Sequence, residues 1–280
     1  MPELPEVETV ARGLQTSLVS RVITGVQVDW PRSIASSSPK EFAERLVGRQ
    51  VRAVGRRGKY VIVSLDAGYL LIHLKMSGRL RVVPADEPPD KHVHVAFGLN
   101  NGMELRFQDV RKFGRVYLVR EVSEVTLDLG PEPLSDEFTL ERFREILERR
   151  TGRLKSLLLN QEFLAGLGNI YADEALYAAR LHPLRRANTL APAEQEHLYH
   201  AIRTVLSQAI ARRGTTLTDG GYTDADGQSG GYQHQIAVYG QTGHPCPRCQ
   251  TLVERIVLSG RSTHYCPSCQ SLNANPSQSG

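Results

Sequence analysis

Residues 246–269 read CPRCQTLVERIVLSGRSTHYCPSC and hold every cysteine of the chain, Cys246, Cys249, Cys266 and Cys269. Two CxxC pairs with 16 residues between them have the spacing of a tetrahedral four-thiolate zinc site. A disulfide framework would need a secreted context, which an acidic N-terminus without an apolar signal core does not indicate. The sequence therefore predicts one structural Zn²⁺, and four protein ligands leave no open position for catalysis.

The segment between the two cysteine pairs has the pattern of a hairpin. Residues 252–258 read as a strand, and Ser259, Gly260, Arg261 and Ser262 are expected to end it. A hairpin of this size is too small to fold unaided, so metal binding would supply its folding energy. We expect the metal to hold a two-stranded hairpin whose tip presents Arg261.

Charge is distributed in local clusters. The chain has 280 residues, enough for two domains and the zinc module, and its net charge of +4 is modest. Three groups of basic residues stand out, and any one of them alone could be a solvated face: Arg56, Arg57 and Lys59; Arg106, Arg111, Lys112 and Arg115; Arg149, Arg150, Arg153 and Lys155. Together with the zinc hairpin they favour a polyanion as partner, bound through phosphate contacts without sequence preference.

The first half of the chain has the periodicity of β-structure. Residues 60–65 and 69–74 flank a short turn, and residues 93–97 and 103–107 flank a loop that ends in Asn101-Gly102. Several short strands at this spacing predict a sandwich or barrel, not a parallel sheet. A rigid polar connector at residues 130–134 ends this region.

Beyond the connector the period becomes helical. Helices are expected at residues 138–150, 154–160, 170–179 and 193–213. Residues 215–232 are rich in Gly, Asp and Thr and predict a mobile loop that leads into the zinc hairpin. The Ser, Asn, Gln and Pro after Cys269 predict a disordered tail.

Two glycines precede a helix start in Gly166-Leu167-Gly168-Asn169. They allow close backbone approach, and the free N–H groups of a helix N-terminus attract a phosphate. Asn169 could contact that anion, and it would suit an N-cap equally well. Both functions use the same exposed helix end.

The N-terminus, Met1-Pro2-Glu3-Leu4-Pro5-Glu6, offers a nucleophile. If Met1 is removed, the secondary amine of Pro2 can attack an aldehyde-like carbon and form an iminium ion. Glu3 lies close enough to serve as acid or base. The alternative is an ordinary helix start, because Pro5 suits a first turn and apolar residues follow at helical spacing.

These motifs occur together and in order with Gly58-Lys59-Tyr60, Leu74-Lys75-Met76-Ser77-Gly78-Arg79 and Gly168-Asn169-Ile170-Tyr171-Ala172. The set resembles bacterial formamidopyrimidine-DNA glycosylase over residues 1 to about 270. The resemblance implies an α+β multidomain fold: an N-terminal β-sandwich with flanking helices (1–130), a helix–two-turn–helix domain with the lesion loop (131–232), a zinc-finger β-hairpin (233–270) and a tail (271–280). It also implies a cytoplasmic, monomeric bacterial repair enzyme that binds double-stranded DNA between its domains.

The resemblance implies excision of oxidised purines, 8-oxoguanine and formamidopyrimidines, followed by β- and δ-elimination. It assigns catalysis to Pro2, Glu3, Lys59 and Arg261, although a hairpin lysine is ordinarily a solvated charge. Three residues would fill the space of the extruded base, and two of them, Met76 and Phe113, could instead be core residues: Met76, Arg111 and Phe113. Four more would contact the DNA backbone: His92, Arg150, Lys155 and Asn169.

Other functions fit part of the pattern. An endonuclease VIII-like enzyme shares the proline, the glutamate and the zinc finger but prefers oxidised pyrimidines, and Leu4 with the Met76, Arg111 and Phe113 set favours the purine enzyme. A non-catalytic zinc-containing DNA-binding protein would not need Pro2, and a proline-dependent tautomerase would leave the zinc hairpin unexplained. Residues 218–222 depart from the family pattern, so the preference among oxidised purines stays open.

Overall fold

A computed structural model describes residues 1–217 and 221–272 of the chain. Contacts divide the chain into two compact units, which are not contiguous in sequence. The first unit comprises Met1–Leu127 and Ala209–Gln233, and the second comprises Asp128–Gln208 and His234–Gly280. Residues 218–220 of the expected loop and residues 273–280 of the expected tail lie outside the described residues. The four segments inferred from the sequence, and the three boundaries between them, remain predictions.

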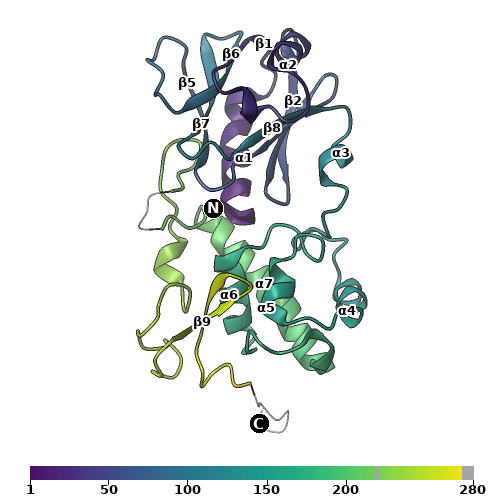
Figure 1. Cartoon of the computed structure of the whole chain (residues 1–280), viewed down its shortest axis with the longest axis vertical. Coiled ribbons are helices and arrows are strands. Elements are labelled where there is room, and N and C mark those ends of the chain that lie inside the picture. The colour runs from purple at the N-terminus through teal and green to yellow at the C-terminus, as the bar shows by residue number, and fades with distance from the viewer. Residues whose placement is uncertain (218–220, 273–280) are drawn as a thin grey trace. The chain divides into compact units, whose positions relative to one another are not determined.

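The first unit contains two four-stranded antiparallel sheets, which confirms the predicted sandwich (Figure 1). One sheet has the order β1-β6-β7-β5 and the other β2-β3-β4-β8. The strands are β1 (Ile23–Val28), β2 (Val51–Arg57), β3 (Tyr60–Leu65), β4 (Tyr69–His73), β5 (Gly78–Pro84), β6 (Val93–Leu99), β7 (Met103–Asp109) and β8 (Arg115–Val119). Alternate residues of β3 are buried, as the period of a half-buried strand requires.

Helix α1 (Leu4–Leu18) packs its apolar face against strands of both sheets. That face is fully buried, since Val7, Val10, Leu14 and Leu18 recur at helical spacing and each is at most 1% exposed. Two further helices and a 3₁₀ turn complete this part of the unit: α2 (Pro39–Leu46), α3 (Ser123–Thr126) and η1 (Pro31–Ser33). The N-terminal residues therefore lead directly into a helix that is buried in the core.

The second unit is helical, and each of the four predicted helices is present with small shifts at its ends. Its elements are α4 (Leu140–Glu148), α5 (Leu154–Leu159), α6 (Asn169–Ala178), η2 (Ala187–Thr189) and most of α7 (Pro192–Ala211), followed by η3 (Tyr232–Gln235) at the junction of the units. In the part of the chain that the structure describes, no helix combines the length and apolar character needed to span a bilayer.

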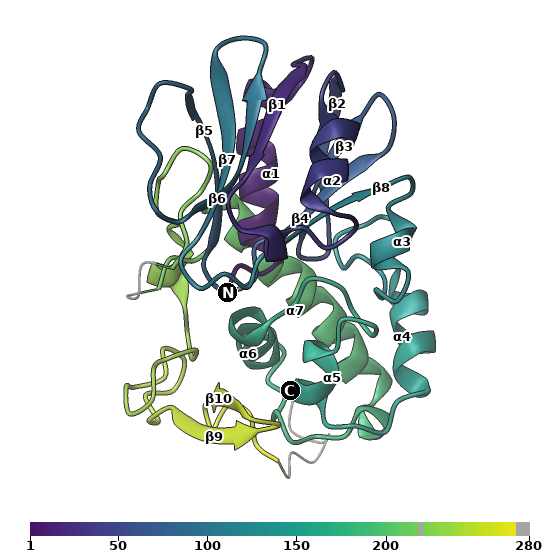
Figure 2. The ribbon, with the colours of Figure 1, turned by 45° about the horizontal axis from the view of Figure 1, so that its top comes forward.

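The predicted hairpin is formed by β9 (Glu254–Leu258) and β10 (Arg261–Tyr265), which lie side by side in Figure 2. Its turn is shorter than the sequence suggested. Ser259 and Gly260 alone form it, both with positive φ, and Arg261 is the first residue of β10 opposite Leu258. Two residues in the left-handed region match the twist of the strands, so the strand resumes before Arg261.

Residues 215–217 and 221–231 have irregular backbone, as predicted, but the segment packs onto α1 and does not form an open loop. The carboxylate of Glu6, which is 1% exposed, accepts the N–H of Thr215 at 2.7 Å. Gly214 has a φ of 78°, and a Cβ there would lie 2.7 Å from Glu6 Oε1. Glycine is therefore required at this position for the close approach.

Candidate functional site

The N-terminal residues are held at the start of α1. Pro2 and Glu3 are buried, and the N–H of Glu3 donates to Glu6 Oε2 at 2.8 Å. Glu6 therefore binds the backbone on both sides, at Glu3 through one oxygen and at Thr215 through the other. A fully engaged carboxylate fixes the position of the Pro2 nitrogen relative to the segment that follows α7.

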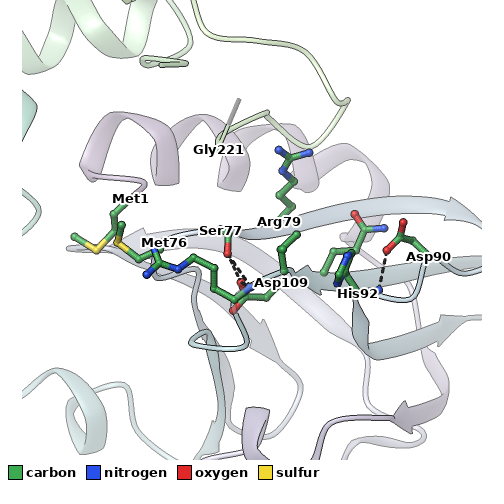
Figure 3. A pocket seen from close by; sticks show the side chains of 11 residues that line it. Met1, Met76, Ser77, Arg79, Asp90, His92, Asp109 and Gly221 are labelled. Carbon is green, nitrogen blue, oxygen red and sulfur yellow. Dashed lines mark hydrogen bonds between the residues drawn. The ribbon is translucent and has the colours of Figure 1, made fainter. Parts of the chain in front are cut away.

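A pocket of about 380 Å³ opens beside this terminus. Met1, which is 44% exposed, lies with Met76 at one end, whereas Asp90 and His92 lie at the other (Figure 3). The walls between them include Ser77, Arg79, Gln108, Asp109, Val110, Arg111 and Gly221. Removal of Met1 would leave the Pro2 amine at the end of this pocket.

Lys59 lies in the two-residue turn between β2 and β3, after Gly58 with a φ of 55°. Its side chain is only 7% exposed, so the alternative of a solvated hairpin lysine is wrong. Burial of an ammonium group is costly unless it is compensated, which makes this position unusual for a turn.

His73 lies at the end of β4 and is buried beside Lys59. Its Nδ1 accepts the N–H of Lys75 at 3.0 Å, so the neutral ring carries its proton on Nε2. Burial, together with the charges of Lys75 and Lys59, lowers the pKa of His73 to about 3. A neutral His73 thus holds the left-handed residue Lys75 that begins the turn carrying Met76.

Residues 109–114 form a loop organised by one carboxylate. Asp109 is fully buried, and it accepts hydrogen bonds from Ser77 Oγ at 2.5 Å, Arg111 N at 3.2 Å and Gly114 N at 2.7 Å. On the other side, Arg115 Nη1 donates to the carbonyl oxygens of residues 112, 113 and 114. The donors and the acceptors of the loop are therefore both fixed by charged partners.

The 109–114 loop and the turn that carries Met76, which Ser77 joins to Asp109, expose apolar side chains. Phe113 is 49% exposed and Met76 37%, so neither is a core residue. The Arg111 guanidinium lies 4.9 Å from the centre of the Phe113 ring, and Lys112 Nζ lies 4.2 Å from the centre of the Trp30 ring. The loop is a preformed projection with an apolar and cationic tip.

In the second unit, Asp173 on α6 joins three elements. It is 1% exposed, its Oδ1 accepts Lys155 Nζ at 2.6 Å, and its Oδ2 accepts the backbone N–H of His264 at 2.9 Å. Lys155 is fully buried and also donates to the carbonyl of Asn169 at 2.9 Å. The expectation that the Lys155 ammonium contacts the DNA backbone does not fit this burial, because the group has no exposed surface.

The hairpin brings Arg261 toward the start of α6. Asn169 Nδ2 donates to the carbonyl of Ser262 at 2.8 Å, and Ser156 Oγ lies 3.2 Å from Ser259 Oγ. Arg261 itself is exposed. The structure thus brings Asn169, Lys155 and the strand that begins with Arg261 together in one unit, whereas Arg150 is exposed just after α4.

The four cysteines converge as predicted. Their Sγ atoms all lie within 4.8 Å of one another, with separations of 3.9 Å for Cys246–Cys269, 3.5 Å for Cys249–Cys266 and 3.4 Å for Cys249–Cys269. A disulfide needs about 2.05 Å. A tetrahedron of about 2.3 Å Zn–S bonds has edges of about 3.8 Å, so the four thiolates fit one zinc ion.

Further contacts, besides those of Asn169 and Asp173, tie the zinc module to α6. Tyr177 OH lies 3.3 Å from Cys246 Sγ, and Arg248 lies 4.1 Å from the centre of the Tyr177 ring and donates to the Tyr177 carbonyl at 2.7 Å. Buried Glu174 accepts three backbone N–H groups, at residues 237, 238 and 239, each at 2.9 Å. Outer contacts of this kind orient metal ligands.

Three family models match the chain in succession. They are the formamidopyrimidine-DNA glycosylase N-terminal domain over residues 1–116, its H2TH domain over 129–220, and a zinc finger found in FPG and IleRS over 243–272. The formamidopyrimidine-DNA glycosylase of Herpetosiphon aurantiacus is 51% identical over 263 residues, which cover 92% of this chain and 96% of that protein. The chain belongs to the formamidopyrimidine-DNA glycosylase family.

Further relatives and solved structures support the same family assignment. The formamidopyrimidine-DNA glycosylase of Pelotomaculum thermopropionicum is 50% identical, with 89% of this chain and 91% of that protein covered. A Lactococcus lactis FPG mutant in complex with Fapy-dG containing DNA superimposes with a TM-score of 0.90 at 36% identity, covering 96% of this chain and 100% of that chain. The MutM (FPG) protein of Thermus thermophilus gives 0.87 at 42% identity, covering 96% and 98%.

Several residues that organise the site could not be assigned this role from the sequence. Glu6, His73, Asp109 and Asp173 are buried and titratable, and each holds a segment that carries a predicted site residue. Asp173 follows Asn169 by four positions on α6, so helical spacing could have drawn attention to it. The distant partners of Glu6 and Asp109, which are Thr215 and Ser77, leave no local pattern in the sequence.

We predict that the chain binds one zinc ion and that its loss unfolds the finger. Cys249→Ser with Cys266→Ser should abolish zinc binding, because metal-binding energy is folding energy in such modules. Tyr177→Phe should retain the metal but release it faster to a chelator, since it removes only the hydroxyl near Cys246. Elemental analysis and chelator kinetics measure both effects. Stoichiometric zinc in the double variant would contradict the assignment.

His73 predicts a pH dependence of stability. Its pKa is about 3 in the folded chain and about 6.5 when unfolded, so the unfolded chain binds this proton first as the pH falls. The contribution is complete above pH 6.5 and is lost toward pH 3, by up to about 1.4 kcal/mol of unfolding free energy per pH unit.

Denaturant midpoints across this pH range measure the effect, with His73→Asn expected to show a shallower loss than wild type. Exposed His197→Asn on α7 is the matched control and should follow wild type. Equal acid sensitivity of wild type and His73→Asn would count against a buried neutral imidazole.

Proposed function

We propose that this chain is a bifunctional DNA glycosylase and abasic-site lyase of base excision repair that removes oxidised purines, including 8-oxoguanine and formamidopyrimidines. Family membership supports the reaction class, and related structures carry Fapy-dG, carbocyclic 8-oxo-G and abasic-site DNA. The observation that carries the proposal is the position of Pro2 just before a buried helix, joined directly to Met1, which lines the pocket.

The chemistry starts at this secondary amine. After Met1 is removed, the Pro2 nitrogen attacks the sugar C1′ of an extruded nucleotide, the base leaves, and an iminium ion forms. Glu3 assists ring opening and proton transfer. Buried Lys59 supplies a cationic contact or a proton. β-Elimination and then δ-elimination cleave the strand on both sides of the sugar.

The remaining predicted residues divide into two roles. Met76, Arg111 and Phe113 fill the space left by the extruded base, and their exposure on the turn after β4 and on the 109–114 loop supports this role. Four others act at the DNA backbone: His92, Arg150, Asn169 and Arg261, with Lys155 supporting Asn169 from the interior. We also propose that the protein acts as a monomer in the bacterial cytoplasm.

Borohydride trapping tests the proposed function. The mature chain should form a reducible covalent adduct with an 8-oxoguanine:cytosine duplex, because an iminium ion at Pro2 can be reduced in place. Intact mass and peptide mapping should place the sugar remnant on residue 2. A variant that retains Met1 should trap far less, since its nucleophilic amine is displaced.

Three results would overturn parts of the proposal. A remnant on Lys59 would reject Pro2 as the nucleophile. Faster excision of an oxidised pyrimidine than of 8-oxoguanine would favour the endonuclease VIII-like alternative, and absence of any adduct from active preparations would favour a non-catalytic DNA-binding protein.

The 109–114 loop predicts that base excision and strand cleavage respond differently to one substitution. Arg111 N and Gly114 N bind different oxygens of Asp109, so Asp109→Asn must turn its NH₂ group toward one of these two N–H donors, which should cost about 1.5–3 kcal/mol in loop positioning. Excision of a paired lesion should fall about 10–100-fold, since each 1.4 kcal/mol is about tenfold. Strand cleavage at a preformed abasic site needs no base extrusion and should change much less.

Single-turnover rates on the two duplexes measure this difference, with Asp66→Asn at the β3–β4 turn as control. If Asp109→Asn slowed both reactions equally, the loop would serve general folding and not base extrusion.

A further inference from the structure

Two exposed arginines of the second unit face each other across an antiparallel backbone pair. Arg153 and Arg186 form a β-bridge, and the flanking hydrogen bonds run from Leu154 N to Arg185 O at 2.8 Å and from Ala187 N to Gly152 O at 3.0 Å. This is the non-hydrogen-bonded type of pair, in which opposite side chains approach most closely. Both arginines are exposed.

Such a juxtaposition is unfavourable without an anion. Like charges directly opposite each other in an antiparallel pair destabilise it, and arginine cannot lose its proton to relieve the repulsion. Among the described residues, no carboxylate oxygen lies within 4.0 Å of the guanidinium nitrogens of Arg153 or Arg186. The one hydrogen bond of these two groups runs from Arg186 Nη1 to the Thr151 carbonyl at 3.4 Å, and it leaves most of their donors available.

Other arginines of the second unit are neutralised. Arg142 pairs with Glu145 at 2.9 Å, Arg144 with Glu196 at 3.4 Å, and Arg185 with Glu194 through two contacts of 2.9 Å. The contrast is sharp between the neighbours Arg185 and Arg186, since one is bound to an acid and the next is opposite another arginine. Exposed Arg149 and Arg150 add further positive charge in the same short segment.

The pair is continuous with the hairpin that carries Arg261. Arg153 immediately precedes α5, and Ser156, one helical turn later, lies 3.2 Å from Ser259 in the turn between β9 and β10. Arg261 follows that turn by one residue. A polyanion held by Arg261 would therefore find further positive charge along the same surface of the second unit.

We propose that Arg153 and Arg186 form a phosphate-binding site that extends the DNA contact of the second unit beyond Arg261 and Asn169. The ligand is a backbone phosphate of the bound duplex, held by two guanidinium groups that each offer paired N–H donors. The inference rests on the proposed function, because it takes DNA as the partner. It adds a site that reads no sequence and no lesion.

The test compares Arg153→Gln, Arg186→Gln and the double variant with wild type, using Arg142→Gln as the matched control. Affinity for an undamaged duplex and for a lesion duplex is measured across a salt series. The log-affinity against log-salt slope should flatten by about 0.9 for each single variant and about 1.8 for the double variant. Affinity for both duplexes should fall equally. The melting temperature of the protein should stay level or rise, because the repulsion between the two arginines is relieved.

The borohydride adduct separates this site from the proposed function. The double variant should give full adduct at saturating enzyme, since the site lies outside the chemistry. If wild type forms the adduct but the variant slopes match Arg142→Gln, the arginine pair is a solvated surface and the inference is overturned. If no adduct forms although the slopes flatten as expected, the phosphate site stands and the catalytic proposal falls.

Inorganic phosphate distinguishes a free anion from the duplex. Phosphate could raise the melting temperature of wild type but not of the double variant, while the salt slopes for DNA are the same in both proteins. This result would make the pair an anion site unrelated to DNA and would also overturn the inference.

Discussion

A carboxylate removed from water must have its oxygens hydrogen-bonded or paired with a cation, and this requirement shapes both units of the protein. Four buried acids meet it by binding backbone N–H groups of segments that are distant in the chain or otherwise irregular: Glu6, Asp109, Asp173 and Glu174. Each such segment carries or adjoins a residue of the candidate site. Removing one acid would leave several donors unsatisfied, so these segments are held more firmly than loops usually are.

The same requirement explains why residues of the candidate site can lie on irregular backbone and still be fixed in position. A catalytic or wedge residue must be placed to within a fraction of an ångström, and loops alone seldom achieve this. Asp109 and Arg115 fix the N–H and carbonyl groups of the 109–114 loop from opposite sides. Gly114 allows the tight return, since a Cβ there would lie 2.3 Å from the Phe107 ring. The apolar tip is thereby exposed without being free to collapse.

In the second unit, the zinc site and the buried acids of α6 together hold the hairpin in place. Zinc holds the two CxxC turns together, whereas Asp173 attaches β10 to α6 through His264 and Glu174 attaches the segment before the finger. Because both acids lie next to each other on α6, one helix positions the hairpin and its Arg261. Lys155 neutralises Asp173 from the interior, which explains why a lysine in a basic cluster is buried while its arginine neighbours stay exposed.

The sequence by itself determined the zinc ligands, strands β3, β4, β6, β7 and β9, the helices of the second half and the family, because cysteine spacing, residue periodicity and contiguous motifs are local properties. It also singled out Pro2 and Glu3. Tertiary structure alone decided that Lys155 is buried, that Phe113 is exposed, and that Arg153 faces Arg186. Whether a side chain is buried or paired with a charge depends on which segments, distant in sequence, pack together in the fold. No local pattern in the chain could therefore specify these outcomes.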